Sequence, residues 1–107
     1  MQAIQVEEYG EPDRLILAET AMPEAGPDDA LVRISYAGVN YIDVYMRNGT
    51  YASSHTYRTP LPMTLGMEGV GRVESVGSEV TDLSPGARVA YCLERGSYAQ
   101  YARCLLY

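Results

Sequence analysis

The residues best suited to chemistry lie between positions 37 and 51, in the run AGVNYIDVYMRNGTY. Tyr45 and Tyr51 carry phenol hydroxyls, which are neutral hydrogen-bond donors at pH 7 because the ordinary tyrosine pKa is about 10. Such donors suit a carbonyl or quinone oxygen that gains negative charge during reduction. The alternative is that Tyr41 and Tyr45 pack a helix onto a sheet. Spacing alone favours packing, because the chain has ten tyrosines and no phenylalanine.

One short helix is expected in this run. Tyr41, Val44 and Tyr45 recur at spacings of three and four, which is typical of an amphipathic helix. Asn40 suits the N-cap, Asp43 suits the first turn, and a glycine follows as a stop signal. The polar segment TYASSHTYRTPLPMT comes next, and loops of this length in compact domains are often functional.

The remainder predicts a mainly β chain, folded as an irregular barrel or sandwich. Alternating apolar residues and frequent Gly and Pro residues favour short strands over long helices. We expect strands over residues 2–8, 14–20, 30–38, 68–77, 87–93 and 97–104.

The last two of these strands are expected to form a hairpin joined by ERG. That pairing would set Cys92 opposite Ala99 and Cys104 opposite Ala87, separating the sulfurs by about five residues along the sheet. At about 3.3 Å per residue this is beyond disulfide distance. Two free thiols are therefore expected, as in a reducing compartment.

Composition narrows the class of protein. A chain of 107 residues, 47% hydrophobic and 21% charged, fits one globular domain. The net charge of −6 argues against nucleic-acid and anionic-membrane partners. There is neither an apolar run of about 18 residues nor a signal peptide in MQAIQVEEYG, so we expect a cytoplasmic protein.

Three other chemistries lack their motifs. GMEGVGRVESVG has Glu74 in place of the third glycine of a dinucleotide fingerprint, and strand-like residues follow it instead of a helix. His55 is the one histidine, and no ligand spacing typical of a metal site occurs. There is no G-x-S-x-G motif of a hydrolase.

The runs GVNYID, LGMEGVGRVESVG and PGARVAY, in this order and spacing, resemble the quinone oxidoreductase branch of the medium-chain dehydrogenase/reductases. The resemblance covers essentially all 107 residues. It implies a GroES-like fold, a distorted β-barrel with one short helix, as the N-terminal portion of the catalytic domain. The chain ends in apolar RCLLY, so we expect it to be part of a longer protein whose Rossmann cofactor domain is absent from residues 1–107.

The resemblance also implies a zinc-independent site. Zinc-dependent members have a cysteine where this chain has Asn40 and a histidine where it has Met67, and they carry a cysteine-rich lobe where this chain has LERGSY. An amide and a thioether are poor zinc ligands, so no metal site is expected. Glu68 is retained, as a structural or supporting carboxylate.

In the zinc-independent branch, the counterparts of Asn40, Tyr45 and Tyr51 line the nicotinamide and substrate cleft. The resemblance thus assigns Asn40 and Tyr45 to the cofactor NADPH, and Tyr45 and Tyr51 to the substrate oxygen. Asp43 matches as well, as a hydrogen-bonding residue of the helix turn, and is grouped with the catalytic candidates. Tyr41 stands where phenylalanine is common and is expected to pack. Tyrosines at phenylalanine positions also raise the prospect of buried, unpaired hydroxyls.

The resulting hypothesis is part of an NADPH-dependent quinone oxidoreductase that reduces a quinone or an activated carbonyl. Two alternatives stay open. One is an enoyl or alkenal reductase of the same branch, and the other is an isolated or engineered GroES-like module without activity. Without its cofactor domain the chain is expected to bind NADPH weakly, and unpaired strand edges would favour homo-oligomers.

Overall fold

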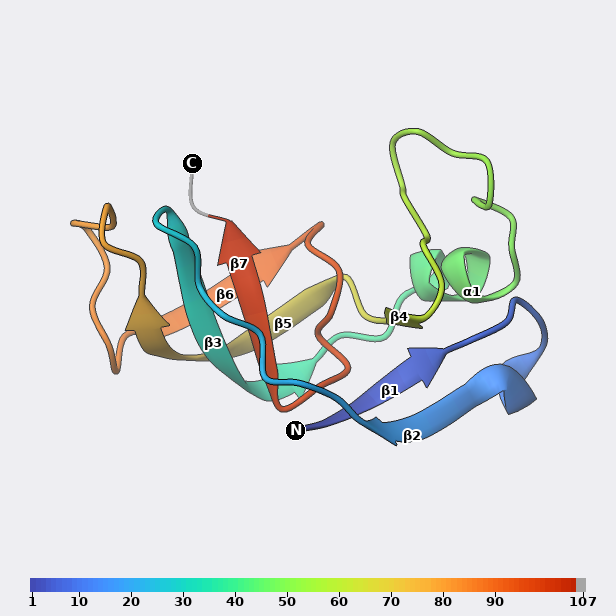
Figure 1. Cartoon of the computed structure of the whole chain (residues 1–107), viewed down its shortest axis with the longest axis horizontal. Helices are drawn as coiled ribbons and strands as arrows, with labels where there is room; N and C mark the ends of the chain where they lie inside the picture. Colours follow the sequence, from blue (N-terminus) through green and yellow to red (C-terminus); the bar gives the residue numbers. More distant parts are fainter. Residues whose placement is uncertain (106–107) are drawn as a thin grey trace.

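The computed structural model describes residues 1–105, so the last two residues of the expected domain 1–107 lie outside it. Two antiparallel sheets make up the molecule, one of three strands in the order β2-β1-β4 and one of four strands in the order β6-β5-β3-β7 (Figure 1). The elements are β1 (Gln2–Val6), η1 (Pro12–Arg14), β2 (Leu15–Glu19), β3 (Asp29–Ala37), α1 (Tyr41–Arg47), β4 (Met63–Thr64), β5 (Glu68–Val76), β6 (Arg88–Cys92) and β7 (Tyr101–Leu105). The expectation of a mainly β chain with one short helix is confirmed. The two-residue strand β4 and the short 3₁₀ turn η1 were not predicted.

The two long strands β3 and β5 form the centre of the four-stranded sheet. In β5 the residues Gly69, Gly71 and Val73 are buried, while the residues between them are exposed, which is the pattern of a strand with one solvated face. A side chain at Gly71 would run into the backbone carbonyl of Arg33 on β3. The glycine at position 71 therefore allows the two backbones to approach closely, and the β3–β5 register shifts twice along the pair.

The expected hairpin between β6 and β7 is wrong. β6 pairs with β5 and β7 pairs with β3, so the two strands lie at opposite edges of their sheet. The intervening segment instead turns to the other sheet, where Ala99 bridges Ala3 and the Ile4 amide donates to the Tyr98 carbonyl at 2.8 Å. Both cysteines are free as expected, with Cys92 exposed and Cys104 buried, although the register argument for this was wrong.

Each sheet has its own hydrophobic cluster. The first, which we call the methionine cluster, contains Val6, Met46, Met63, Leu65 and Met67. It joins the three-stranded sheet to α1, which lies beside β4 in Figure 1. The second contains Ala30, Val32 and Cys104, with Tyr91 packed against it. No helix in the described part of the chain is both long and apolar enough to cross a membrane.

Tyr91 in the second cluster carries a buried hydroxyl with no hydrogen-bond partner among residues 1–105. Burial raises its pKa, and the neighbouring Cys104 thiol adds to that effect. An unpaired buried hydroxyl costs free energy, so Tyr91→Phe is expected to raise the free energy of unfolding by about 1 kcal/mol. Urea unfolding followed by circular dichroism measures this free energy. Tyr9→Phe is the control, for which we expect the opposite change. The Tyr9 hydroxyl donates to the Thr59 carbonyl at 2.7 Å, so its loss lowers stability. A destabilised Tyr91→Phe variant would contradict the expectation.

Candidate functional site

Helix α1 is held on the molecule by Ile42 and Met46, which face the methionine cluster. Tyr41 points the other way, with 79% of its surface exposed, so the expectation that it packs is wrong. The reason is the phase of the helix: the buried positions are Asp43 and Met46. Tyr45 is 41% exposed and is not part of the buried face of α1.

The start of α1 is fixed by Asp43. One carboxylate oxygen, Oδ2, accepts the backbone N–H of Asn40 at 3.0 Å, as in a capping box. Asn40 is the N-cap as expected, and its side chain is exposed at the point where the chain leaves β3 for the helix. The helix ends at Arg47, and the N–H of the C-cap residue Asn48 donates to the Val44 carbonyl at 2.9 Å.

Tyr45 and Tyr51 lie in contact, as parts of a row of three aromatic rings. The ring centroids of Tyr45 and Tyr51 are 5.8 Å apart in an edge-to-face arrangement. Tyr57 stacks on Tyr51 with centroids 5.1 Å apart, and both rings pack against the methionine cluster. Within the described chain, the tyrosine hydroxyls that make hydrogen bonds are those of Tyr9 and Tyr98. The hydroxyls of the aromatic row thus remain available to a ligand.

The loop that carries Tyr51 and Tyr57 is shaped by its own polar side chains. Asn48 Oδ1 accepts the N–H of Thr50 at 2.9 Å, and Ser54 Oγ accepts the N–H of Tyr57 at 2.9 Å. This loop extends from α1 away from the sheets (Figure 1). His55 is exposed on it.

Asp43 is engaged inside the domain. It is only 4% exposed, and its Oδ2 accepts hydrogen bonds from Asn40 and from the Tyr98 hydroxyl, the latter at 2.7 Å. These are the contacts of a helix-turn residue. Its assignment to the catalytic group remains a prediction.

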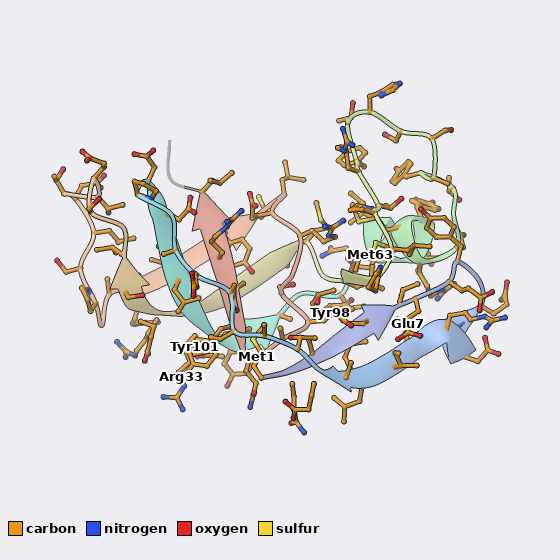
Figure 2. All side chains as sticks on the ribbon, viewed as in Figure 1. Met1, Glu7, Arg33, Met63, Tyr98 and Tyr101 are labelled. Carbon is orange, nitrogen blue, oxygen red and sulfur yellow. The ribbon has the colours of Figure 1, made fainter. Side chains whose placement is uncertain are left out.

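Tyr98 is the site residue that the sequence analysis missed. Burial, followed by its hydrogen bond to Asp43, raises the pKa of Tyr98. It lies 55 positions from Asp43, and no local pattern connects the two. Figure 2 shows it in the middle of the molecule, between the two sheets.

An open groove of about 470 Å³ begins two residues before Asn40, at Gly38. Its walls are the ends of β3, β5 and β6, and Glu68 lies directly against Gly38. The side chains of Tyr36, Val39 and Tyr41 around Asn40 are largely exposed. The chain therefore presents apolar surface next to an exposed amide.

No group of three or more potential ligands for a metal ion occurs among the described residues. Met67 is buried in the methionine cluster. It stands where zinc-dependent medium-chain dehydrogenase/reductases have a histidine. Its thioether contributes to packing.

Comparison with known proteins assigns the fold. The family model of the alcohol dehydrogenase GroES-like domain matches residues 26–105. This chain belongs to that family. The expected GroES-like fold is thereby confirmed, as is the N-terminal portion of a medium-chain dehydrogenase/reductase of the quinone oxidoreductase type.

The relatives of this GroES-like domain are longer proteins. A quinone oxidoreductase from Pseudomonas aeruginosa is 42% identical over 91% of this chain and 29% of its own length. A probable quinone oxidoreductase from Schizosaccharomyces pombe is 37% identical over 92% of the chain and 28% of its own length. The Escherichia coli quinone oxidoreductase complexed with NADPH superposes with a TM-score of 0.89, at 29% identity, over 98% of this chain and 31% of that one. The chain thus spans less than a third of these relatives.

Proposed function

We propose that this GroES-like domain is the substrate-binding portion of a cytoplasmic, NADPH-dependent quinone oxidoreductase that works without zinc. The observation that carries the proposal is the contact of Tyr45 with Tyr51, next to a helix that begins at the exposed Asn40. Quinone oxidoreductases among its relatives support the substrate class.

Reduction of a quinone or activated carbonyl places negative charge on its oxygen. NADPH, when bound, supplies the hydride. In the proposed site, the hydroxyls of Tyr45 and Tyr51 donate hydrogen bonds to that oxygen as the charge develops. Stacking on Tyr57 holds the Tyr51 ring, so little reorganisation is needed during the reaction.

The residues present fit one end of NADPH. The nicotinamide is a flat ring with a carboxamide, and the exposed Asn40 amide beside apolar surface and the open groove suits both features. The phosphates are not matched here, because the Gly69–Gly71 region is strand β5 and not a turn before a helix. We therefore expect NADPH to bind residues 1–107 weakly, since nothing in this region of β5 holds its phosphates.

The packing of Met67 supports the absence of zinc from the proposed mechanism. Its side chain packs inside the methionine cluster. The neutral amide of Asn40 is a much poorer zinc ligand than the cysteine thiolate found at this position in zinc-dependent members. Polarisation of the substrate oxygen then depends on the tyrosine hydroxyls.

A graft tests the proposal. Residues 1–107 replace the equivalent segment of the Pseudomonas aeruginosa relative, and NADPH oxidation is followed with quinones and with conjugated enones, with and without a chelator. We expect quinone-dependent oxidation that the chelator does not change, with the parent enzyme as control. A folded graft that binds NADPH but reduces no quinone contradicts the proposal. Turnover of enones alone would instead favour the enoyl or alkenal reductase.

A further inference from the structure

The hydrogen bond between Tyr98 and Asp43 joins the start of α1 to a distant part of the chain. The Tyr98 hydroxyl donates to Asp43 Oδ2 at 2.7 Å across 55 sequence positions. The other carboxylate oxygen, Oδ1, is buried and has no partner among the described residues. Tyr98 is therefore the one side-chain donor that this buried carboxylate has in residues 1–105.

The position of Tyr98 is itself set by contacts with the three-stranded sheet and with Leu65, which directly follows β4. Its backbone N–H donates to the Leu65 carbonyl at 2.9 Å, and its carbonyl accepts the N–H of Ile4 on β1 at 2.8 Å. Its ring packs against the methionine cluster. The hydroxyl is thus presented from a fixed frame, close to the sheet junction in Figure 2.

The same Asp43 oxygen accepts the backbone N–H of Asn40 at 3.0 Å. This contact sets the backbone direction at the residue where β3 passes into α1. It also fixes the rotation of α1 about its own axis. The direction in which Tyr45 points depends on that rotation. A movement of the Asp43 carboxylate would therefore be transmitted to both residues.

We propose that Tyr98 is a positioning residue of the candidate site, which acts through Asp43 to hold Asn40 and Tyr45 in their orientations. The inference rests on the proposed function in one respect, namely that Asn40 and Tyr45 face the reactants. Tyr98 itself touches neither and is not a catalytic residue.

Amide hydrogen exchange on the 107-residue chain tests the positioning directly. Tyr98→Phe keeps the packed ring and removes only the hydroxyl. We expect exchange at the Asn40 amide to accelerate at least about tenfold, because a hydrogen bond to a charged group is lost. The slowest amides of β3 and β5 report global opening and are expected to change much less. Tyr101→Phe, at the start of β7, is the matched control and leaves Asn40 within about twofold.

A double-mutant cycle then tests whether Tyr98 acts through Asp43. Asp43→Asn keeps an oxygen for the Asn40 amide but alters the bond to Tyr98. If the two residues act as one unit, the double variant exchanges no faster at Asn40 than the more affected single variant. Additive acceleration overturns the proposal. So does an equal acceleration at Asn40 and in β3 and β5, since that is the result of a merely structural bond.

Activity in the graft provides the second readout. Tyr98→Phe is expected to lower kcat/KM for the quinone about tenfold, while quinone-dependent activity of the Tyr101→Phe graft stays within about twofold. An active graft that Tyr98→Phe leaves unchanged overturns the proposal. An inactive wild-type graft counts against the proposed function instead, and the exchange experiment still decides whether Tyr98 holds Asn40.

Discussion

Replacing Gly66 by alanine is expected to lower the free energy of unfolding by about 3 kcal/mol or more, through combined backbone strain and overpacking. Gly66 has φ +95°, a conformation that side chains rarely adopt. An added Cβ would also meet the Ser97 hydroxyl, the Tyr98 ring at 2.6 Å and the Tyr98 backbone nitrogen at 2.8 Å. The backbone cannot yield cheaply, because the Gly66 carbonyl accepts the N–H of Gly96 at 2.8 Å. Chemical unfolding followed by circular dichroism measures the loss.

Gly86→Ala is the control for this substitution. Gly86 has a similar φ of +91° but nothing lies within 4 Å of the added Cβ. Only the conformational cost of about 1 kcal/mol is then expected. Equal losses for the two variants would show that the contact with Ser97 and Tyr98 contributes nothing.

The second large effect is on catalysis. In the grafted enzyme, Tyr51→Phe is expected to lower kcat/KM for the quinone by about a hundredfold, which is typical for the loss of one donor to a developing oxyanion. The ring stays, so its stacking on Tyr57 and its edge contact with Tyr45 persist. Steady-state kinetics with NADPH held saturating measure the change.

The role of Tyr51 is decided by whether Tyr51→Phe changes kcat or KM. A donor that acts mainly in the transition state lowers kcat and kcat/KM together, whereas uniform binding raises KM alone. Tyr101→Phe, outside the candidate site, should remain close to the parent graft. If Tyr51→Phe leaves kcat/KM unchanged, Tyr51 is not a transition-state donor.

Much of the fold follows from local patterns. The six predicted strands are all present, because alternation and Gly or Pro boundaries are local properties of the chain. Asn40 and Asp43 at the helix start were predicted for the same reason. The prediction of a β6–β7 hairpin was wrong because β7 pairs with β3, a strand far away in the sequence.

The candidate site divides in the same way. Residue type and resemblance selected Tyr45 and Tyr51, and the structure brings their rings together, whereas their catalytic roles stay predictions. Spacing placed Tyr41 on the packed face because it could not distinguish the two sides of so short a helix. Tyr98 was beyond any local signal, since its partner Asp43 is reached only after the sheets have folded.

The methionine cluster has a consequence for oxidative damage. Met46, Met63 and Met67, three of the five methionines, are at most 6% exposed in a single cluster. Peroxide reaches these thioethers only when the cluster opens, and a sulfoxide is too polar to return to an apolar core. Oxidation therefore makes a transient opening of the methionine cluster permanent. Tyr51 and α1 pack on this cluster and lose their support. The candidate site on α1 and Tyr51 would then be lost first, because the second cluster, built on Ala30 and Val32, supports the four-stranded sheet separately.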